Sequence, residues 1–217
     1  MILSAVVLVI VSPLLLAAVI GVRLSSPGPL LYKASRVGRD GQIFTMYKVR
    51  TMHLEREQSS STITGKNDVR VFPFGSLLRY LKIDELPQLL NIVKGEMSIV
   101  GPRPEDPYIV DQYYEPHHRE TLRLRPGLAS PGSLYSYTHG EQMLDGSDPE
   151  KCYVERLLPV KLALDIVYVR NASWHYDLRI ILRTVWTILA AALGRRDFPD
   201  PPELRKAEES KLIHLYS

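Results

Sequence analysis

Residues 84–95 read Asp-Glu-Leu-Pro-Gln-Leu-Leu-Asn-Ile-Val-Lys-Gly. Proline is tolerated in the first turn of a helix and not in its middle, so Pro87 predicts a helix that starts near Asp84. Gly95 directly after Lys94 predicts where that helix ends. The pattern therefore predicts a short helix with two adjacent carboxylates, Asp84 and Glu85, at its N-terminus.

The carboxylate pair has two interpretations. Adjacent carboxylates repel each other, so a metal ion, nearby cations or the positive end of a helix must hold them together. In that case Asp84 and Glu85 form a reactive site. Alternatively, Asp84 is an ordinary N-cap and Glu85 an ordinary first-turn residue. The pair alone does not choose between these interpretations.

Cations elsewhere in the chain favour the first interpretation. Arg79 precedes the pair by a short helical step, and Arg103 lies in a loop stiffened by two prolines. Lys48 and Arg50 share one face of an expected strand, where they either face an anion or are simply solvated. Carboxylates with several Arg and Lys fit Mg²⁺-assisted phosphoryl transfer, and an Asp such as Asp84 can attack phosphorus directly.

The N-terminus is an apolar segment. Residues 1–22 carry no charged side chain. The segment is therefore long enough for a membrane span, which needs about 20 apolar residues. Ser12 and Pro13 interrupt the segment, and arms of about 18 Å and 15 Å on either side are each too short to cross the bilayer. Two arrangements are open, a kinked transmembrane helix and a re-entrant hairpin. A cleaved signal peptide is disfavoured because no basic region precedes the apolar run.

The rest of the chain predicts an α/β fold that is mostly helical, with one small β-hairpin. Short strands are expected at 30–33 and 42–49, joined by a turn at 38–41. Helices are expected at 74–82, within 107–124, at 151–170 and at 178–196; loops are expected at 55–68 and 125–141. The helix over 178–196 is amphipathic, so it either lies in the membrane interface or packs on the core. The charged tail from 197 is expected to be loosely ordered.

Composition excludes several kinds of site. The net charge is only +3, which does not favour nucleic-acid binding. The single cysteine, Cys152, cannot form an internal disulfide, and we interpret it as structural. His117 and His118 are adjacent rather than spaced as zinc ligands, so we expect them at the surface. P-loop, nucleophile-elbow and dinucleotide-binding motifs are missing from the sequence.

Several ordered motifs resemble those of the monotopic phosphoglycosyl transferases, also called the bacterial sugar transferase family. The resemblance runs from about Met1 to Leu193. It rests on Ser12-Pro13, on Ser26 to Pro29, on Arg36 to Gly41, on Tyr47 to Met52, on the dense block from Asp84 to Pro104, on Arg125-Pro126-Gly127, and on the regions around Asp165 and Asp177.

The resemblance implies a two-step reaction. Asp84 would attack the β-phosphate of a UDP-sugar, release UMP and carry the phosphosugar until polyprenyl (undecaprenyl) phosphate accepts it. Mg²⁺ would be the cofactor, close to Asp84 and Glu85. By position, the phosphate ligands would be Lys48, Arg79 and Arg103, and further functional acids would be Asp165 and Asp177. Asp177 is also placed to cap the last helix.

The resemblance also implies a location. Ser12 and Pro13 would bend the apolar segment into a re-entrant hairpin in the bacterial inner membrane, with the catalytic domain on the cytosolic face. The expected domains are the hairpin (1–23), the catalytic domain (24–196) and the tail (197–217). Family members carry a basic stretch ahead of the hairpin, whereas Met1 already lies inside it, so either the start lies upstream or the anchor differs.

The function so implied is the first membrane step of bacterial glycoconjugate assembly, for exopolysaccharide, O-antigen, capsule or glycoprotein. The expected partners are a UDP-sugar, polyprenyl phosphate and the lipid bilayer, with a homo-oligomer open and no nucleic acid. Residues 129–139 are a hypothetical determinant of sugar choice. Two alternatives remain: a catalytically silent membrane adaptor in a polysaccharide assembly complex, and a one-step transferase in which Asp84 acts as a base.

Overall fold

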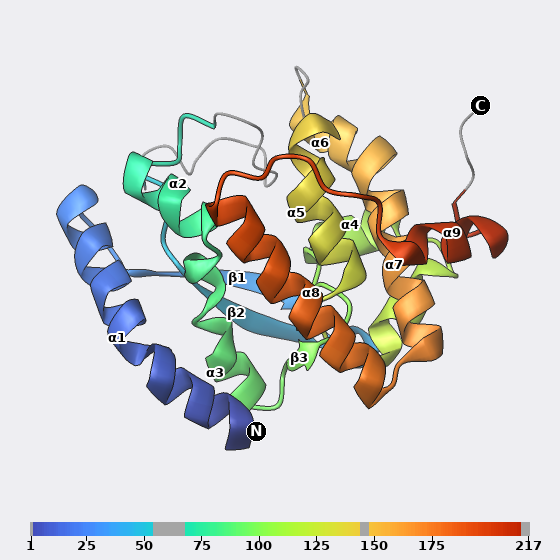
Figure 1. Cartoon of the computed structure of the whole chain (residues 1–217), viewed down its shortest axis with the longest axis horizontal. Helices are drawn as coiled ribbons and strands as arrows, with labels where there is room; N and C mark the ends of the chain where they lie inside the picture. Colours follow the sequence, from blue (N-terminus) through green and yellow to red (C-terminus); the bar gives the residue numbers. More distant parts are fainter. Residues whose placement is uncertain (1, 54–67, 144–147, 214–217) are drawn as a thin grey trace.

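The computed structural model describes residues 2–53, 68–143 and 148–213 (Figure 1). The predicted loop at 55–68 lies outside the described residues except for Asp68.

The strands are β1 (Leu31–Val37), β2 (Ile43–Val49), β3 (Ser98–Val100) and β4 (Gly127–Ala129). The helices are α1 (Ile2–Ser25), α2 (Pro73–Tyr80), α3 (Gln88–Val93), α4 (Pro107–Tyr113), α5 (Pro131–Met143), α6 (Pro149–Cys152), α7 (Leu158–Asn171), α8 (Trp174–Ala192) and α9 (Pro202–Glu209). Short helical turns are η1 (Arg39–Gly41), η3 (Ile83–Glu85), η4 (His118–Arg123) and η5 (Tyr153–Leu157). A mostly helical chain with small two-stranded sheets confirms the predicted fold class at that level.

Helix α1 continues through Pro13 in the structure. The Ser12 hydroxyl donates to the carbonyl of Val9 at 2.7 Å, close to the point where proline removes a backbone donor. Val7–Ser25 is apolar and long enough to cross a membrane, judged by length and composition. One side of α1 packs on the domain, because Ala18 and Val22 are buried in a cluster with residues of β2 and α2.

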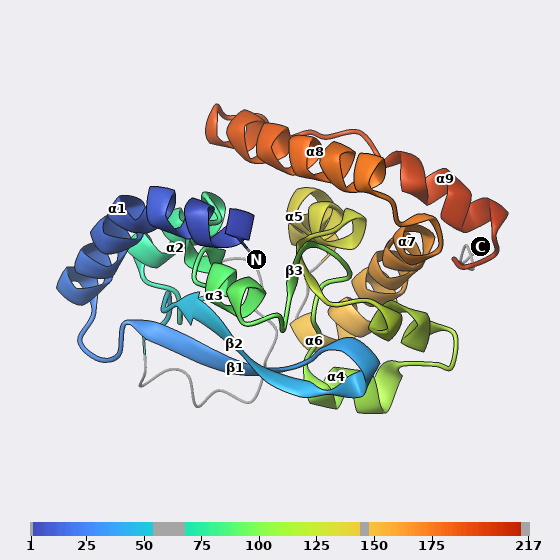
Figure 2. The same ribbon diagram turned by 90° about the horizontal axis from the view of Figure 1, so that it is seen from below.

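The predicted hairpin is confirmed. Strands β1 and β2 pair antiparallel from Leu31 opposite Val49 to Val37 opposite Ile43. The turn η1 requires positive φ angles, 54° at Asp40 and 80° at Gly41, which suit Asp and Gly. The hairpin lies along one side of the molecule, and α1 and α8 lie along the opposite side (Figure 2).

The predicted loop at 125–141 is wrong. It contains strand β4, which pairs in parallel with β3, and most of helix α5. The two backbones approach so closely that a Cβ on Gly127 would lie 2.1 Å from the nitrogen of Gly101. Strands of three residues show no alternation in sequence, and their pairing is non-local, so the Pro-Gly content dominated the prediction.

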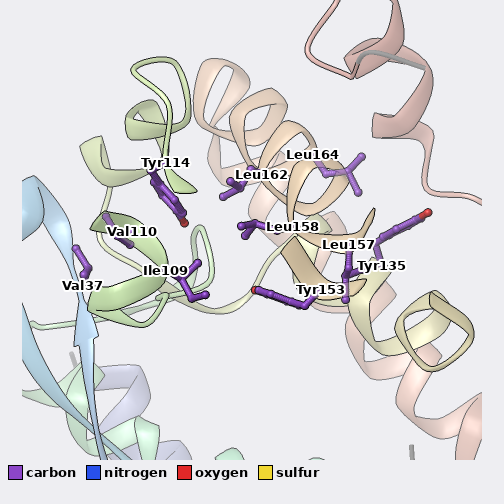
Figure 3. Close-up of a cluster of buried hydrophobic side chains, with 10 residues drawn as sticks. All are labelled: Val37, Ile109, Val110, Tyr114, Tyr135, Tyr153, Leu157, Leu158, Leu162 and Leu164. Atoms are coloured by element: carbon purple, nitrogen blue, oxygen red, sulfur yellow. The ribbon is translucent and has the colours of Figure 1, made fainter. Parts of the chain in front are cut away.

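The largest hydrophobic cluster lies between α4, α5, η5 and α7 (Figure 3). The drawn residues are Val37, Ile109, Val110, Tyr114, Tyr135, Tyr153, Leu157, Leu158, Leu162 and Leu164. The predicted helix at 151–170 is thus confirmed, although η5 is a π-helical segment that joins α6 to α7. Cys152 ends α6 and is a free thiol, half-buried.

The end of the chain differs from the prediction. Helix α8 confirms the helix expected at 178–196, but its N-cap is Ser173 and not Asp177. The tail is not loosely ordered at α9, where the buried carboxylate of Glu203 accepts hydrogen bonds from Arg183 at 2.9 Å and Tyr176 at 2.9 Å. Because those partners come from α8, the polar sequence of α9 gave no local signal of this docking.

Candidate active site

The carboxylate pair lies in a tight turn and not at the start of one helix. Lys82 has a left-handed backbone (φ 57°), which redirects the chain into η3. Asp84 and Glu85 belong to η3, Pro87 is the N-cap of α3, and α3 itself starts at Gln88. The predicted helix start near Asp84 is therefore wrong by four residues.

Glu85 is held by cations from three segments. Arg103 donates to both carboxylate oxygens, at 2.5 and 3.2 Å, and Lys48 donates at 3.2 Å. The ammonium of Lys82 lies 3.9 Å away. Burial alone would raise the pKa of Glu85, but the charges of Arg103 and Lys48 outweigh it and hold the pKa well below its ordinary value. Glu85 is thus a fixed anion that organises the cations around it.

Asp84 is the opposite case. Its side chain is buried (6% exposed), and Oδ1 has no hydrogen-bond partner among the residues the structure describes. Burial, and then the charge of Glu85, raise the pKa of Asp84, while Lys48, Lys82 and Arg79 act in the opposite direction. Two neighbouring carboxylates whose pKa values are pushed apart are typical of sites with divided chemical roles.

Of the predicted cations, Lys48 and Arg103 meet at Glu85, and Arg79 is near Asp84. The Nε of Arg79 donates to the Thr51 hydroxyl at 2.8 Å, which orients the guanidinium. Burial lowers the pKa of Arg79, and the charge of Asp84 opposes that shift. Lys48, Arg79 and Arg103 therefore place positive charge around the carboxylate pair, which suits the binding of phosphate oxygens.

The structure places Arg50, one of the two cations of the expected strand face, against backbone carbonyls and not in solvent. Arg50 is buried and donates to the carbonyls of Pro29 (2.6 Å), Ser26 (2.8 Å) and Pro27 (3.1 Å). These contacts hold the segment that follows α1. The other cation, Lys48, donates to Glu85 of the carboxylate pair.

Asp165 lies behind the site and supports it. Its buried carboxylate accepts the backbone N–H of Arg103 at 3.1 Å and that of Gly132 at 2.9 Å. Burial raises the pKa of Asp165, and these two hydrogen bonds oppose the rise. Asp165 thus joins α7 to the loop that carries Arg103 and to the start of α5.

The structure does not bring Asp177 into contact with the carboxylate pair. Its side chain accepts a hydrogen bond from the hydroxyl of Tyr168 at 2.7 Å, which fastens α8 to α7. Within the described residues, no hydrogen bond or ion pair joins Asp177 to Asp84 or Glu85.

Sequence reasoning missed a buried cluster beside the Arg103 loop. Glu105 accepts hydrogen bonds from Lys161 and from the hydroxyl of Tyr153, the latter at 2.7 Å. Burial lowers the pKa of Lys161 to about 7, and Arg103 acts in the same direction. A signal existed, because Lys161 and Asp165 stand four residues apart within an otherwise apolar run.

The segment at 129–139 also reaches the site, as helix α5 and not as a loop. The ammonium of Lys82 lies 4.9 Å from the ring centroid of Tyr137, and the Tyr137 hydroxyl donates to the carbonyl of Tyr80 at 2.8 Å. Tyr137 of α5 therefore contacts Lys82, one of the cations next to Glu85.

Comparison with known proteins identifies the family. A model described as bacterial sugar transferase matches residues 1–191. The chain belongs to the bacterial sugar transferase family. The resemblance that the motifs indicated is thereby confirmed.

Named relatives of this bacterial sugar transferase come from several bacteria. It is 36% identical over 191 residues to a UDP-N-acetylgalactosamine-undecaprenyl-phosphate N-acetylgalactosaminephosphotransferase of Aeromonas hydrophila. It is 35% identical over 189 residues to a UDP-glucose:undecaprenyl-phosphate glucose-1-phosphate transferase of Caulobacter vibrioides. These alignments cover 87% and 86% of this chain but 42% and 66% of the relatives, so the chain spans less than two thirds of their length. An exopolysaccharide production protein of Rhizobium leguminosarum is 32% identical, with 86% of this chain and 91% of that protein covered.

The side chains around Asp84 offer oxygen ligands that fit a divalent cation. No cluster of three metal-binding side chains is found in the described part of the chain. Oδ1 of Asp84 is buried and has no hydrogen-bond partner among the described residues, so the Asp84 carboxylate is uncommitted, whereas the oxygens of Glu85 already accept from Arg103 and Lys48. Mg²⁺ is commonly bound by one or two carboxylates together with waters and substrate phosphates, which matches this donor set.

Proposed function

We propose that the chain is a phosphoglycosyl transferase that moves a sugar-1-phosphate from a UDP-sugar to polyprenyl phosphate, with Asp84 as the nucleophile. The observation that carries this proposal is the buried, unpartnered Oδ1 of Asp84 beside cations gathered at Glu85. The names of the Aeromonas and Caulobacter relatives support the reaction class and the two substrates.

In the proposed reaction, Oδ1 of Asp84 attacks the β-phosphorus of the UDP-sugar. The bond from that phosphorus to the bridging oxygen breaks, and UMP leaves with the electron pair and the oxygen. The phosphosugar is then an acyl phosphate on Asp84. An oxygen of polyprenyl phosphate attacks the same phosphorus and releases Asp84 as a carboxylate, which gives polyprenyl diphosphate-sugar and regenerates the enzyme.

The cations bind and orient in this scheme. Lys48, Arg79 and Arg103 contact phosphate oxygens, and the fixed charge of Glu85 keeps Lys48 and Arg103 in place. Mg²⁺ would be held through Asp84, with Glu85 close to it, and would neutralise phosphate charge and stabilise the leaving UMP. The reaction would be the first membrane step of a bacterial glycoconjugate pathway, in keeping with the name of the Rhizobium relative.

One experiment separates this proposal from its alternatives. The purified protein is incubated with Mg²⁺ and a panel of UDP-sugars, first without lipid. UMP release near one equivalent, with a phosphosugar mass on Asp84, is expected. Turnover only with polyprenyl phosphate, and without an adduct, would favour the one-step route. A protein that releases no UMP with any donor, with or without lipid, is the silent adaptor.

We further propose that the enzyme is monotopic in the bacterial inner membrane, with its catalytic domain on the cytosolic face. The helices α1 and α8 lie along the same side of the molecule (Figure 2), and both expose large apolar side chains. Examples are Val9, Ile10, Leu16 and Leu24 on α1, and Trp174, Leu182, Trp186 and Leu189 on α8. Such a surface suits the lipid interface, where tryptophan is enriched.

Tryptophan fluorescence tests the position of α8. The chain has two tryptophans, Trp174 and Trp186, and both lie on α8. In nanodiscs made with brominated acyl chains, we expect the fluorescence to be quenched relative to nanodiscs of unbrominated lipid. Trp174→Phe and Trp186→Phe variants assign the quenching to each end of the helix. Equal fluorescence in both kinds of nanodisc would place α8 away from the acyl chains.

A labelling experiment tests the re-entrant arrangement of α1. A Ser4→Cys substitution in a Cys152→Ser background provides one thiol at the N-terminus. With Pro13 present, we expect no reaction with an impermeant maleimide added outside intact spheroplasts. Pro13→Ala restores the missing backbone hydrogen bond and straightens the helix, so outside labelling is expected to appear. Outside labelling of the Pro13 protein itself would show a transmembrane helix.

A further inference from the structure

Helix α3 carries two buried side-chain amides, Gln88 and Asn91. Gln88 is 1% exposed and Asn91 is 0% exposed. They share one short helix and one chemistry, since each amide has two N–H donors and a carbonyl acceptor. A structural role predicts that both amides have partners inside the protein.

Asn91 meets that expectation. Its Oδ1 accepts the backbone N–H of Tyr47 at 3.2 Å. Its Nδ2 donates to the carbonyl of Thr45 at 2.7 Å and to the carboxylate of Glu96 at 2.7 Å. The amide is therefore fully used in joining α3 to strand β2 and to the turn after α3.

Gln88 does not meet the expectation for a structural amide. Its Nε2 is buried and has no hydrogen-bond partner among the described residues. A buried donor without a hydrogen-bond partner destabilises the folded protein, so this one calls for an explanation. Only two other buried side-chain atoms in the described part of the chain share this condition, and one of them is Oδ1 of Asp84.

The two unpartnered atoms belong to neighbouring turns. Leu86 and Pro87 both have right-handed helical backbones, so Gln88 follows Asp84 by about one helical turn. One atom is an acceptor able to attack phosphorus, and the other is only a donor. A phosphoryl group under attack by Asp84 would present non-bridging oxygens, which accept hydrogen bonds and gain negative charge as the reaction proceeds.

We propose that the side-chain amide of Gln88 is a catalytic residue that donates a hydrogen bond to a non-bridging oxygen of the phosphoryl group that Asp84 attacks. This inference rests on the proposed function. Gln88 keeps both of its amide protons and makes no covalent bond in either step. Its donor has no partner among the described residues, and a hydrogen bond to an oxygen that gains negative charge becomes stronger in the transition state than in the bound substrate, so its contribution is mainly to kcat.

The test compares Gln88→Met with Asn91→Leu in full-length protein in nanodiscs. Methionine has nearly the length of glutamine but cannot donate. UMP release is measured with Mg²⁺, polyprenyl phosphate and UDP-glucose or UDP-N-acetylgalactosamine, whichever the wild type uses. Melting temperatures are measured without substrate and in EDTA.

For Gln88→Met we expect kcat to fall about 100-fold, the scale of one lost donor to a developing oxyanion, with little change in KM. Its melting temperature should equal or exceed that of the wild type, because the unpartnered donor is gone. Asn91→Leu should lower the melting temperature, since it leaves Thr45, Tyr47 and Glu96 without their partner.

Three results would overturn the inference. Activity of Gln88→Met within threefold of the wild type would show that the donor is unused. A fall in melting temperature as large as that of Asn91→Leu would show a structural role. A raised KM with kcat retained would place the contact on a ground-state group such as the sugar. A wild type that releases no UMP would instead refute the proposed function itself, and this inference with it.

Discussion

Asp84→Asn is expected to reduce UMP release by about 10⁴-fold or more, the scale of a lost nucleophile. The amide cannot form the acyl phosphate, so the phosphosugar adduct should also disappear from the intact-protein mass spectrum. Asparagine preserves the shape of the side chain, and the cations at Glu85 keep their partner. The loss should therefore be a loss of chemistry and not of folding.

A stability measurement separates those two causes. Burial and the charge of Glu85 raise the pKa of Asp84, so its ionised form is disfavoured in the folded protein. Removing that charge should leave the melting temperature at pH 7 in EDTA unchanged or higher. Asp148→Asn is the matched control, because Asp148 is exposed and caps α6, a role that asparagine also fills. Substantial UMP release by Asp84→Asn would exclude Asp84 as the nucleophile.

Lys161→Met is expected to lower the free energy of unfolding by about 3–5 kcal/mol, the usual cost of stranding one member of a buried ion pair. Lys161 and Glu105 are both buried, and the hydroxyl of Tyr153 completes their cluster. The substitution would leave the carboxylate of Glu105 without its cation. The measurement is denaturant unfolding in detergent micelles, followed by circular dichroism.

Two controls frame this result. Arg170→Met breaks a surface pair with Glu120 and should cost about 0–1 kcal/mol. The double variant Lys161→Met with Glu105→Gln removes both charges, so it should regain part of the stability that Lys161→Met loses. A cost for Lys161→Met no larger than that for Arg170→Met would show that the buried cluster does not stabilise the fold.

The features predicted well from sequence are those with a local signal. The hairpin was recognisable from its turn residues, and the helices α2, α7 and α8 from the spacing of their apolar residues. Strand β4 and helix α9 were missed because their reasons are non-local. Position 127 requires glycine because the backbone of Gly101 leaves no room for a Cβ atom. The charged helix α9 packs on the protein through hydrogen bonds between Glu203 and residues of α8.

The residues of the candidate site also fall into those predicted from the sequence and those found only in the structure. Lys48, Arg79, Asp84, Glu85 and Arg103 were named from motifs and residue chemistry, without any geometry. Lys82 and Gln88 were not named, although Lys82 lies beside Glu85 and Gln88 follows Asp84 by one turn. A left-handed backbone and an unpartnered donor leave no pattern in a single sequence.

The sequence by itself determined the family, the apolar segment, the local helices and hairpin, and the set of charged residues available for chemistry. Only the tertiary structure decided how those charges are used. Arg103 and Lys48 meet at Glu85, whereas Arg50 turns to the carbonyls after α1. Oδ1 of Asp84 is buried without a hydrogen-bond partner among the described residues. The physical reason is that pKa and reactivity depend on burial and on distances between residues far apart in the chain, which local spacing does not encode.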